Sequence, residues 1–111
     1  MVKKSERVEA GTGDVFTDLG YGDAGERRLK VQLAMRVNEL VKGRKLPQSK
    51  TAALLDIPQP HVSDLVNYKL NRFSSERLLH FLTLLDHDVE IRIRPKPVKR
   101  QKGTVSVLVA A

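Results

Sequence analysis

The sequence predicts an all-α fold of four to five short helices followed by one C-terminal β-strand, which we expect to be used in dimerisation. Apolar residues recur every three or four positions in separate stretches between residues 23 and 88, as on amphipathic helices. Apolar and charged residues then alternate over residues 89–94, as on a strand with one buried face. A break of three residues between two of the helical stretches indicates a helix-turn-helix.

The predicted helix-turn-helix occupies residues 48–67, and the rest of the chain is organised around it. The expected packing residues are Thr51, Ala52, Leu54 and Leu55 in its first helix and Val62, Leu65 and Val66 in its second. Only Asp56, Ile57 and Pro58 separate the two helices, so the helices must cross steeply. A pair of adjacent alanines, Ala52 and Ala53, is small enough to allow the close approach, and the second helix is left protruding.

The protruding helix turns a polar face away from its apolar stripe. The residues on this outward arc are Gln59, Pro60, His61, Ser63, Asp64 and Asn67. Short hydrogen-bonding side chains displayed on a helix suit the edges of bases in a DNA major groove. The pattern alone fits a plain helical packing unit equally well, so composition has to decide between the two.

The composition favours an anionic partner. The 111 residues include 20 Lys and Arg against 13 Asp and Glu, a formal charge of +7. A merely soluble basic protein is the alternative. An apolar content of 41% supports one modest core, which a small helical protein often completes by dimerising. The chain has no cysteine, no membrane-spanning apolar run and no signal-peptide core, so we expect a soluble protein of the cytoplasm.

The N-terminal part divides into an irregular segment and a scaffold helix. Residues 1–22 show no sustained period, but the apolar group Val15, Phe16, Leu19 and Tyr21 is expected to cover the helical core or a partner. Residues 23–42 form the longest predicted helix, with Asp23 as its N-cap and Gly43 as its C-cap. Its predicted buried face comprises Leu29, Leu33, Val37, Leu40 and Val41, with Ala34 on the flank.

Cations flank the helix-turn-helix on both sides. A cluster of Lys42, Arg44, Lys45 and Lys50 surrounds the start of its first helix. Pro47 presets the φ angle there, and Gln48 could donate a hydrogen bond to a phosphate. Lys69 and Arg72 lie in the loop that leaves the second helix, where they could grip the DNA backbone. A solvated charge run is the alternative interpretation.

A fourth helix and a strand complete the predicted domain. Ser74 is the expected N-cap, Phe73 and Leu78 have hydrophobic-staple spacing, and the apolar stripe is Leu78, Phe81, Leu82 and Leu85. The strand presents Val89, Ile91 and Ile93 on one face. Its mate is either residues 104–109 of the same chain or the same strand of a second subunit, which we favour because two DNA half-sites require a paired unit. The basic residues that follow form a DNA-binding arm or a solubilising tail.

The sequence contains no recognisable catalytic or metal-binding pattern. His61, His80 and His87 lie on different elements without the spacing of metal ligands, and no carboxylate pair or activated nucleophile is placed in a recognisable setting. We therefore expect no enzyme activity, no cofactor and no metal.

Several motifs together resemble the Cro/repressor-type (XRE) helix-turn-helix regulators, in particular their HigA-type antitoxin branch. The motifs are GDVFTDLGYGDAGE, QPHVS after the turn, FSSERL at the start of the fourth helix and DVEI directly after it. The resemblance covers roughly residues 13–95. It implies a lambda-repressor-like all-α DNA-binding domain that dimerises on a palindromic operator, often autoregulates, and in many cases neutralises a ribonuclease-type toxin.

The resemblance also assigns roles to residues. It implies phosphate contact by Gln48, base reading by Gln59, His61 and Ser63, and backbone contact by Asn67 and Lys69. Two residues depart from the family pattern: Pro47 stands where a Thr or Ser cap is usual, and Asp64 places a negative charge on the exposed face. Asp64 could accept a hydrogen bond from a cytosine amino group, or could merely reject wrong sites.

The sequence thus predicts an autoregulating, nucleoid-associated repressor of the antitoxin kind, a homodimer on double-stranded DNA. The alternative is a protein-interaction module that mainly covers a toxin partner, with DNA binding secondary or lost. The operator sequence and the toxin are not encoded in any recognisable motif.

Overall fold

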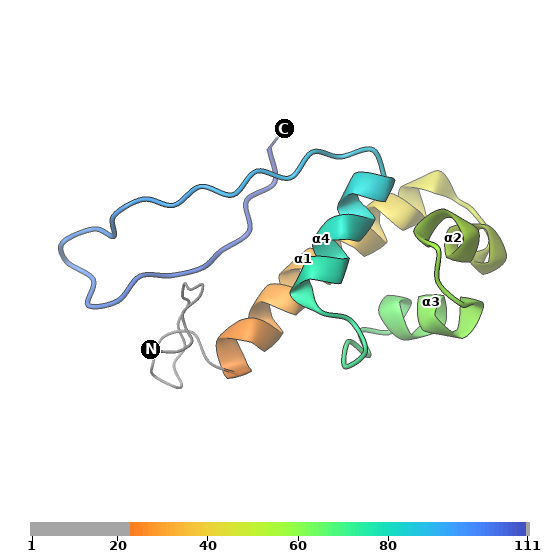
Figure 1. Cartoon of the computed structure of the whole chain (residues 1–111), viewed down its shortest axis with the longest axis horizontal. Coiled ribbons are helices and arrows are strands. Elements are labelled where there is room, and N and C mark those ends of the chain that lie inside the picture. The colour runs from red at the N-terminus through yellow and green to blue at the C-terminus, as the bar shows by residue number, and fades with distance from the viewer. Residues whose placement is uncertain (1–22, 111) are drawn as a thin grey trace. The chain divides into compact units, whose positions relative to one another are not determined.

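The computed structural model describes residues 23–110, and over these the chain is helical with no β-strand (Figure 1). The helices are α1 (Asp23–Arg44), α2 (Gln48–Leu55), α3 (Gln59–Val66) and α4 (Ser75–Leu84). The chain divides into two compact units, of which the helical unit is Lys30–Glu90. The predicted all-α class is confirmed, with four of the expected four to five helices in the described part. The apolar group of residues 15–21 and the Asp23 side chain lie outside the described part.

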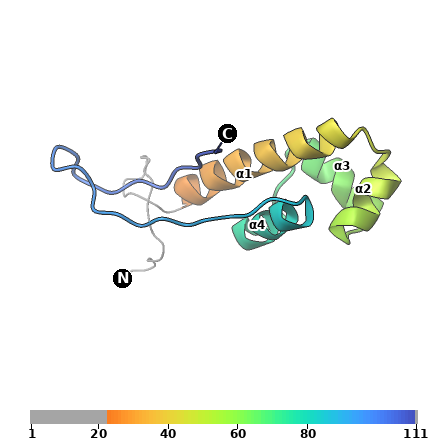
Figure 2. The same cartoon turned by 90° about the horizontal axis from the view of Figure 1, so that it is seen from above.

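Within the helical unit, α4 runs alongside α1, and α2 and α3 lie together at one end of this pair (Figures 1 and 2). The core joins all four helices through Leu33, Ala34, Val37, Ala52, Leu55, Ile57, Val62, Leu65, Phe73, Leu78, Phe81, Leu82 and Leu85. The Phe73 and Phe81 rings meet edge to face, with centroids 5.8 Å apart, at the centre of this core. The Arg77 guanidinium lies over both rings, 5.4 and 5.6 Å from their centroids.

The turn between α2 and α3 has the predicted three residues. Asp56 adopts the left-handed conformation, with φ 59° and ψ 48°. The N–H groups of Asp56 and Ile57 donate to the carbonyls of Ala53 and Ala52, at 3.3 and 3.0 Å, which is the Schellman pattern. Ile57 follows as a buried residue, so the turn is closed by backbone hydrogen bonds on one side and by the core on the other.

Each of the four described helices is followed, within two residues of its end, by a non-glycine residue with positive φ: Lys45, Asp56, Tyr68 and Asp86. The predicted C-cap at Gly43 is wrong, because α1 continues through Gly43 to Arg44 and Lys45 takes the left-handed position. The last residue of the longer helix makes a tertiary contact, since Arg44 Nη2 lies 2.9 Å from Asp86 Oδ2 just beyond the end of α4. The glycine is the obvious local signal for a C-cap, and it gives no sign of this long-range ion pair.

Replacing Asp56 by glycine should stabilise the protein. A left-handed conformation costs a residue with a Cβ about 1–2 kcal/mol, and the greater freedom of glycine in the unfolded chain offsets part of the gain. We expect Asp56→Gly to raise the free energy of unfolding by about 0.5–1 kcal/mol, measured by urea denaturation. Asp56→Ala is the matched control, because it removes the carboxylate but keeps the Cβ. An equal gain in both variants would trace the effect to charge and not to backbone strain.

Three details of the predicted packing are wrong. Val66 was assigned to the buried stripe of α3 but is 41% exposed, because α3 ends there and the chain turns away at Asn67. Ala34 is predicted on a flank of α1 but is fully buried, so it belongs to the core face of this helix together with Leu33 and Val37. Of the two alanines in α2, only Ala52 is buried.

The start and the apolar stripe of α4 are as predicted. Ser74 is the N-cap, and its Oγ accepts a hydrogen bond from the Arg77 N–H at 3.0 Å. All four predicted stripe residues are buried, as is Phe73 directly before the cap. This helix is therefore anchored on one complete face.

The strand predicted at residues 89–94 is not formed in this single chain, and neither is a hairpin with residues 104–109. Within the second unit the chain reverses at a turn in which the Arg100 N–H donates to the Pro97 carbonyl at 3.2 Å, but no strand ladder follows. Ile91 and Ile93 are 76% and 94% exposed. The physical reason is that a strand exists only through hydrogen bonds to a neighbouring strand.

Candidate DNA interface

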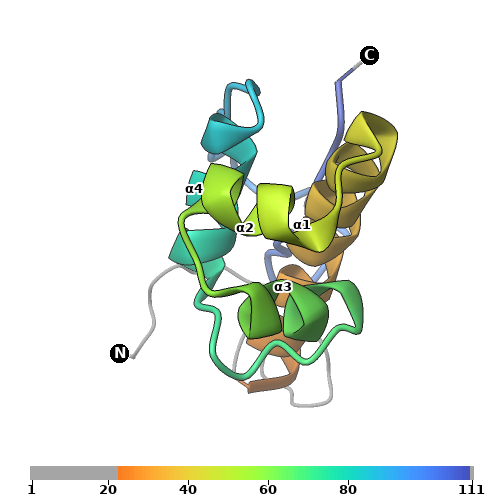
Figure 3. The same ribbon diagram turned by 90° about the vertical axis from the view of Figure 1, so that its right-hand side faces the viewer.

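The predicted base-reading residues lie together on α3. Seen from the side shown in Figure 3, α2 and α3 lie in front of α1 and α4. α3 buries Val62 and Leu65 against the core, so its opposite face is turned outward. On or beside that outward arc Gln59, Pro60 and Asn67 are exposed, and His61, Ser63 and Asp64 are half-buried.

α1 holds the C-terminal end of α3 in place. Asn38 Nδ2 donates to the Leu65 carbonyl at 3.1 Å, an acceptor at the end of α3 that also receives the Tyr68 N–H at 3.1 Å. Lys30 Nζ donates to the Leu70 carbonyl in the following loop at 3.4 Å. Neither contact was predicted, because both join residues far apart in the sequence. With the tight turn at its other end, α3 is fixed at both ends.

The exposed edge around the start of α2 carries a positive charge. Lys42, Lys45 and Lys50 are exposed there, and the first turn of α2 contains no acidic residue. Pro47 is the N-cap of α2 and supplies no side-chain hydrogen bond, as the departure from the family pattern predicted. Arg44 differs from the rest of the predicted cluster because it is paired with Asp86. The three lysines are thus the cations of this cluster best placed to meet an anionic backbone.

The candidate base readers differ in how fully they are displayed. Gln59 is exposed at the first position of α3, so its amide can reach a base with both its donor and its acceptor. His61 is half-buried, and its Nδ1 is buried without a hydrogen-bond partner among the described residues. Only its Nε2 is left to face a base. Gln59 is therefore the better placed of the two.

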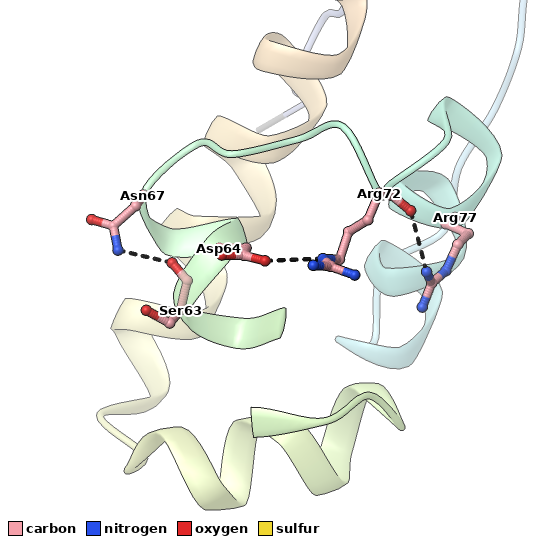
Figure 4. A network of polar contacts seen from close by, with 5 residues as sticks. All are labelled: Ser63, Asp64, Asn67, Arg72 and Arg77. Carbon is pink, nitrogen blue, oxygen red and sulfur yellow. Dashed lines mark hydrogen bonds and ion pairs between the residues drawn. The ribbon is translucent and has the colours of Figure 1, made fainter. Parts of the chain in front are cut away.

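Asn67 is partly occupied by its own helix. Its Nδ2 donates to the Ser63 carbonyl at 2.9 Å, one turn earlier in α3 (Figure 4). An amide nitrogen has two N–H groups, so one remains for the predicted contact with a DNA phosphate. Lys69 follows as an exposed side chain in the loop after α3, where its ammonium is available for the same purpose.

Asp64 and Arg72 form an ion pair that sequence reasoning missed. Asp64 Oδ2 accepts a hydrogen bond from Arg72 Nε at 2.9 Å, and Arg77 Nη1 donates to the Arg72 carbonyl at 3.5 Å (Figure 4). The two partners lie eight residues apart on different elements, so no helical spacing signals the contact. The sequence predicts separate roles for the two residues, Asp64 on the base-reading face and Arg72 as a backbone contact.

Within residues 23–110 no three His, Cys, Asp or Glu side chains gather closely enough to hold a metal ion. None of the helices described is both long and apolar enough to cross a membrane.

The tight α2–α3 connection and the outward polar face of α3 define a helix-turn-helix protein. Residues 15–94 match a family model described as a helix-turn-helix domain. A solved structure named as an XRE family transcriptional regulator is 49% identical, with a TM-score of 0.77, over 79% of this chain and 99% of that one. A search of curated proteins found no match. The chain belongs to the XRE-type helix-turn-helix transcriptional regulators, as its motifs predicted.

Proposed function

We propose that this regulator is a repressor that binds a specific double-stranded DNA sequence through α3. The observation that carries the proposal is the fixed, outward polar face of α3, closed by the Asp56 turn at one end and held by Asn38 at the other. A helix presented in this way can lie in a major groove without reorganising on binding. Bound at its own promoter, the protein would block transcription of its own gene, and it would be associated with the nucleoid.

The proposed mechanism divides the work between two sets of residues. Exposed cations attract the phosphate backbone in a salt-dependent, sequence-independent way, and Gln48, Lys50, Asn67, Lys69 and Arg72 set the register. Gln59, His61 and Ser63 then discriminate among bases, each good bidentate contact contributing on the order of 1–3 kcal/mol.

A mobility-shift titration tests this proposal directly. The full chain is titrated onto the DNA upstream of its own gene, against scrambled competitor and at two salt concentrations. Tight binding that resists competitor, together with a palindromic footprint, is the expected result. Weak binding that vanishes with salt and ignores sequence would mean that the charge acts only generically, and the repressor assignment would be abandoned.

We further propose that the protein binds its operator as a homodimer, because a palindromic site presents two half-sites related by a two-fold axis. Val89, Ile91 and Ile93 alternate with charged residues and are 37%, 76% and 94% exposed. Such residues are candidates for burial against the same segment of a second chain, which would also supply the missing strand partner.

Sedimentation of the full chain and of Ile91→Asp tests the dimer. Wild type is expected to be dimeric at micromolar concentration, and Ile91→Asp is expected to be monomeric because a charge would face the strand interface. Val98→Asp is the matched control, since Val98 is 95% exposed but lies outside the proposed strand. A monomeric wild type, or equal dissociation by both variants, would contradict pairing through residues 89–93.

The antitoxin role is a second proposal, supported by the resemblance to the HigA-type branch and by exposed apolar residues beyond the helical unit. Ile91, Ile93, Val98 and Leu108 are all at least 76% exposed, in a segment of high positive charge. Where a partner brings such exposed apolar residues into one contiguous patch, they form a protein-binding surface. Co-purification with the product of an adjacent reading frame, and relief of that product's toxicity, would support it. A neighbouring product that neither binds nor harms the cell would contradict it.

A further inference from the structure

The ion pair between Asp64 and Arg72 points to a role for Asp64, the acidic residue of α3, other than reading a base or repelling wrong sites. An unpaired carboxylate on a DNA-facing helix repels phosphate, so Asp64 is a liability unless its charge is compensated. Arg72 supplies that compensation, with Nε 2.9 Å from Asp64 Oδ2. The side chains of Asp64 and Arg72 are 27% and 46% exposed, so the pair lies at the surface of the helical unit.

The geometry leaves the far edge of the Arg72 guanidinium available. A guanidinium carries five N–H donors in a rigid planar fork, and only its Nε–H is used in the contact with Asp64. The terminal Nη1 and Nη2 groups can still make a bidentate contact with an anionic acceptor. Binding at Nε fixes the plane of the fork and therefore the direction in which this terminal edge points.

The backbone of Arg72 is held as well. Arg77 Nη1 donates to the Arg72 carbonyl at 3.5 Å, and the Arg77 guanidinium rests on the buried rings of Phe73 and Phe81. The loop between α3 and α4 is thus tied to α3 through the Arg72 side chain and to the core through its main chain (Figure 4). Arg72 is restrained at two points before any ligand arrives.

Building on the proposed DNA binding, we infer that Asp64 is a positioning residue: it orients the Arg72 guanidinium towards a DNA phosphate beside α3. The acceptor is a phosphate because Arg72 lies in the loop after α3, whereas base edges are reached by the N-terminal residues of a recognition helix. Asp64 thereby strengthens DNA binding although its own charge opposes it. Ordering the arginine in advance lowers the entropy lost when the complex forms.

The inference predicts a change opposite in sign to that of simple electrostatics. Removing an acid near DNA should tighten binding, but Asp64→Ala is expected to weaken it about three- to fivefold, on cognate and scrambled DNA alike. Arg72→Ala is expected to weaken binding about five- to tenfold and to lower the slope of log K against log salt by about 1. In the Arg72→Ala background, Asp64→Ala is expected to have no further weakening effect.

Two other variants sharpen the test. Asp56→Asn is the matched control, because Asp56 is an exposed acid of the same helix-turn-helix with no ion pair among the described residues, and Asn tolerates its left-handed backbone. It should leave binding unchanged or tighten it slightly. Arg72→Lys should remove the dependence on Asp64, because one ammonium cannot grip a carboxylate and a phosphate from two edges. Equal unfolding midpoints would show that all variants are folded.

The outcomes separate this inference from the proposed function. In the DNA-free protein, NMR should show an Arg72 Nε–H that is protected from exchange in wild type and unprotected in Asp64→Ala. If that protection is present but wild type shows no sequence-specific binding, the repressor proposal fails. If wild type binds its operator but Asp64→Ala tightens binding, weakens it equally in the Arg72→Ala background, or relaxes preference at a single base pair, the positioning role is overturned.

Discussion

Replacing Phe73 by alanine is expected to lower the free energy of unfolding by about 3–5 kcal/mol. Phe73 is fully buried, meets Phe81 edge to face and is covered by the Arg77 guanidinium, so truncation removes contacts on several sides. Neighbouring side chains collapse only partly into such a cavity. The free energy of unfolding of a domain is typically about 5–15 kcal/mol, so this one substitution would remove a large part of it.

Urea denaturation followed by far-ultraviolet circular dichroism measures the loss. Tyr68→Ala is the matched control, since Tyr68 is an aromatic residue of similar size that is 43% exposed in the loop after α3. It should lower stability by less than about 1 kcal/mol. Equal losses in the two variants would contradict the placement of Phe73 at the centre of the core.

Replacing Gln59 by alanine is expected to abolish much of the discrimination between operator and scrambled DNA. Gln59 is exposed at the first position of α3, the part of a recognition helix that meets base edges. A bidentate glutamine contact to adenine contributes about 1–3 kcal/mol of discrimination, so the specificity ratio should fall roughly 5- to 150-fold. Binding to scrambled DNA should change little, because Gln59 carries no charge.

Competition binding with operator variants measures this ratio. Lys69→Ala is the matched control: it should weaken binding to all sequences alike and lower the salt slope by about 1. A Gln59→Ala protein that loses affinity equally for operator and scrambled DNA would assign Gln59 to the backbone. His61→Ala should change the preference less than Gln59→Ala, since one ring nitrogen of His61 is buried.

The helix-turn-helix was predictable from the sequence because its signals are local. Pro47 and Pro58 each precede a helix, and the three residues from Asp56 leave room for only one kind of connection. The stripe of α4 and the Ser74 cap were likewise readable from spacing within one helix. In each case the determining contacts join residues within about one helical turn.

The features that were missed depend on contacts across the fold. α1 continues past Gly43 to Arg44, whose ion-pair partner Asp86 lies 42 residues further on. The ion pair of Asp64 was not predicted because the α3–α4 loop brings Arg72 to its side. The alternation at residues 89–94 predicts a strand, but a strand also needs a second strand to pair with. The described residues of this chain contain no such partner.

The four left-handed residues at the helix ends mark where the chain could be made more resistant to proteolysis. A left-handed conformation costs a residue with a Cβ on the order of 1–2 kcal/mol, and less for Asp than for Lys or Tyr. Proteases act on the transiently opened chain, whose population falls about tenfold for every 1.4 kcal/mol of added stability. Relieving this backbone strain would therefore slow cleavage of the folded protein.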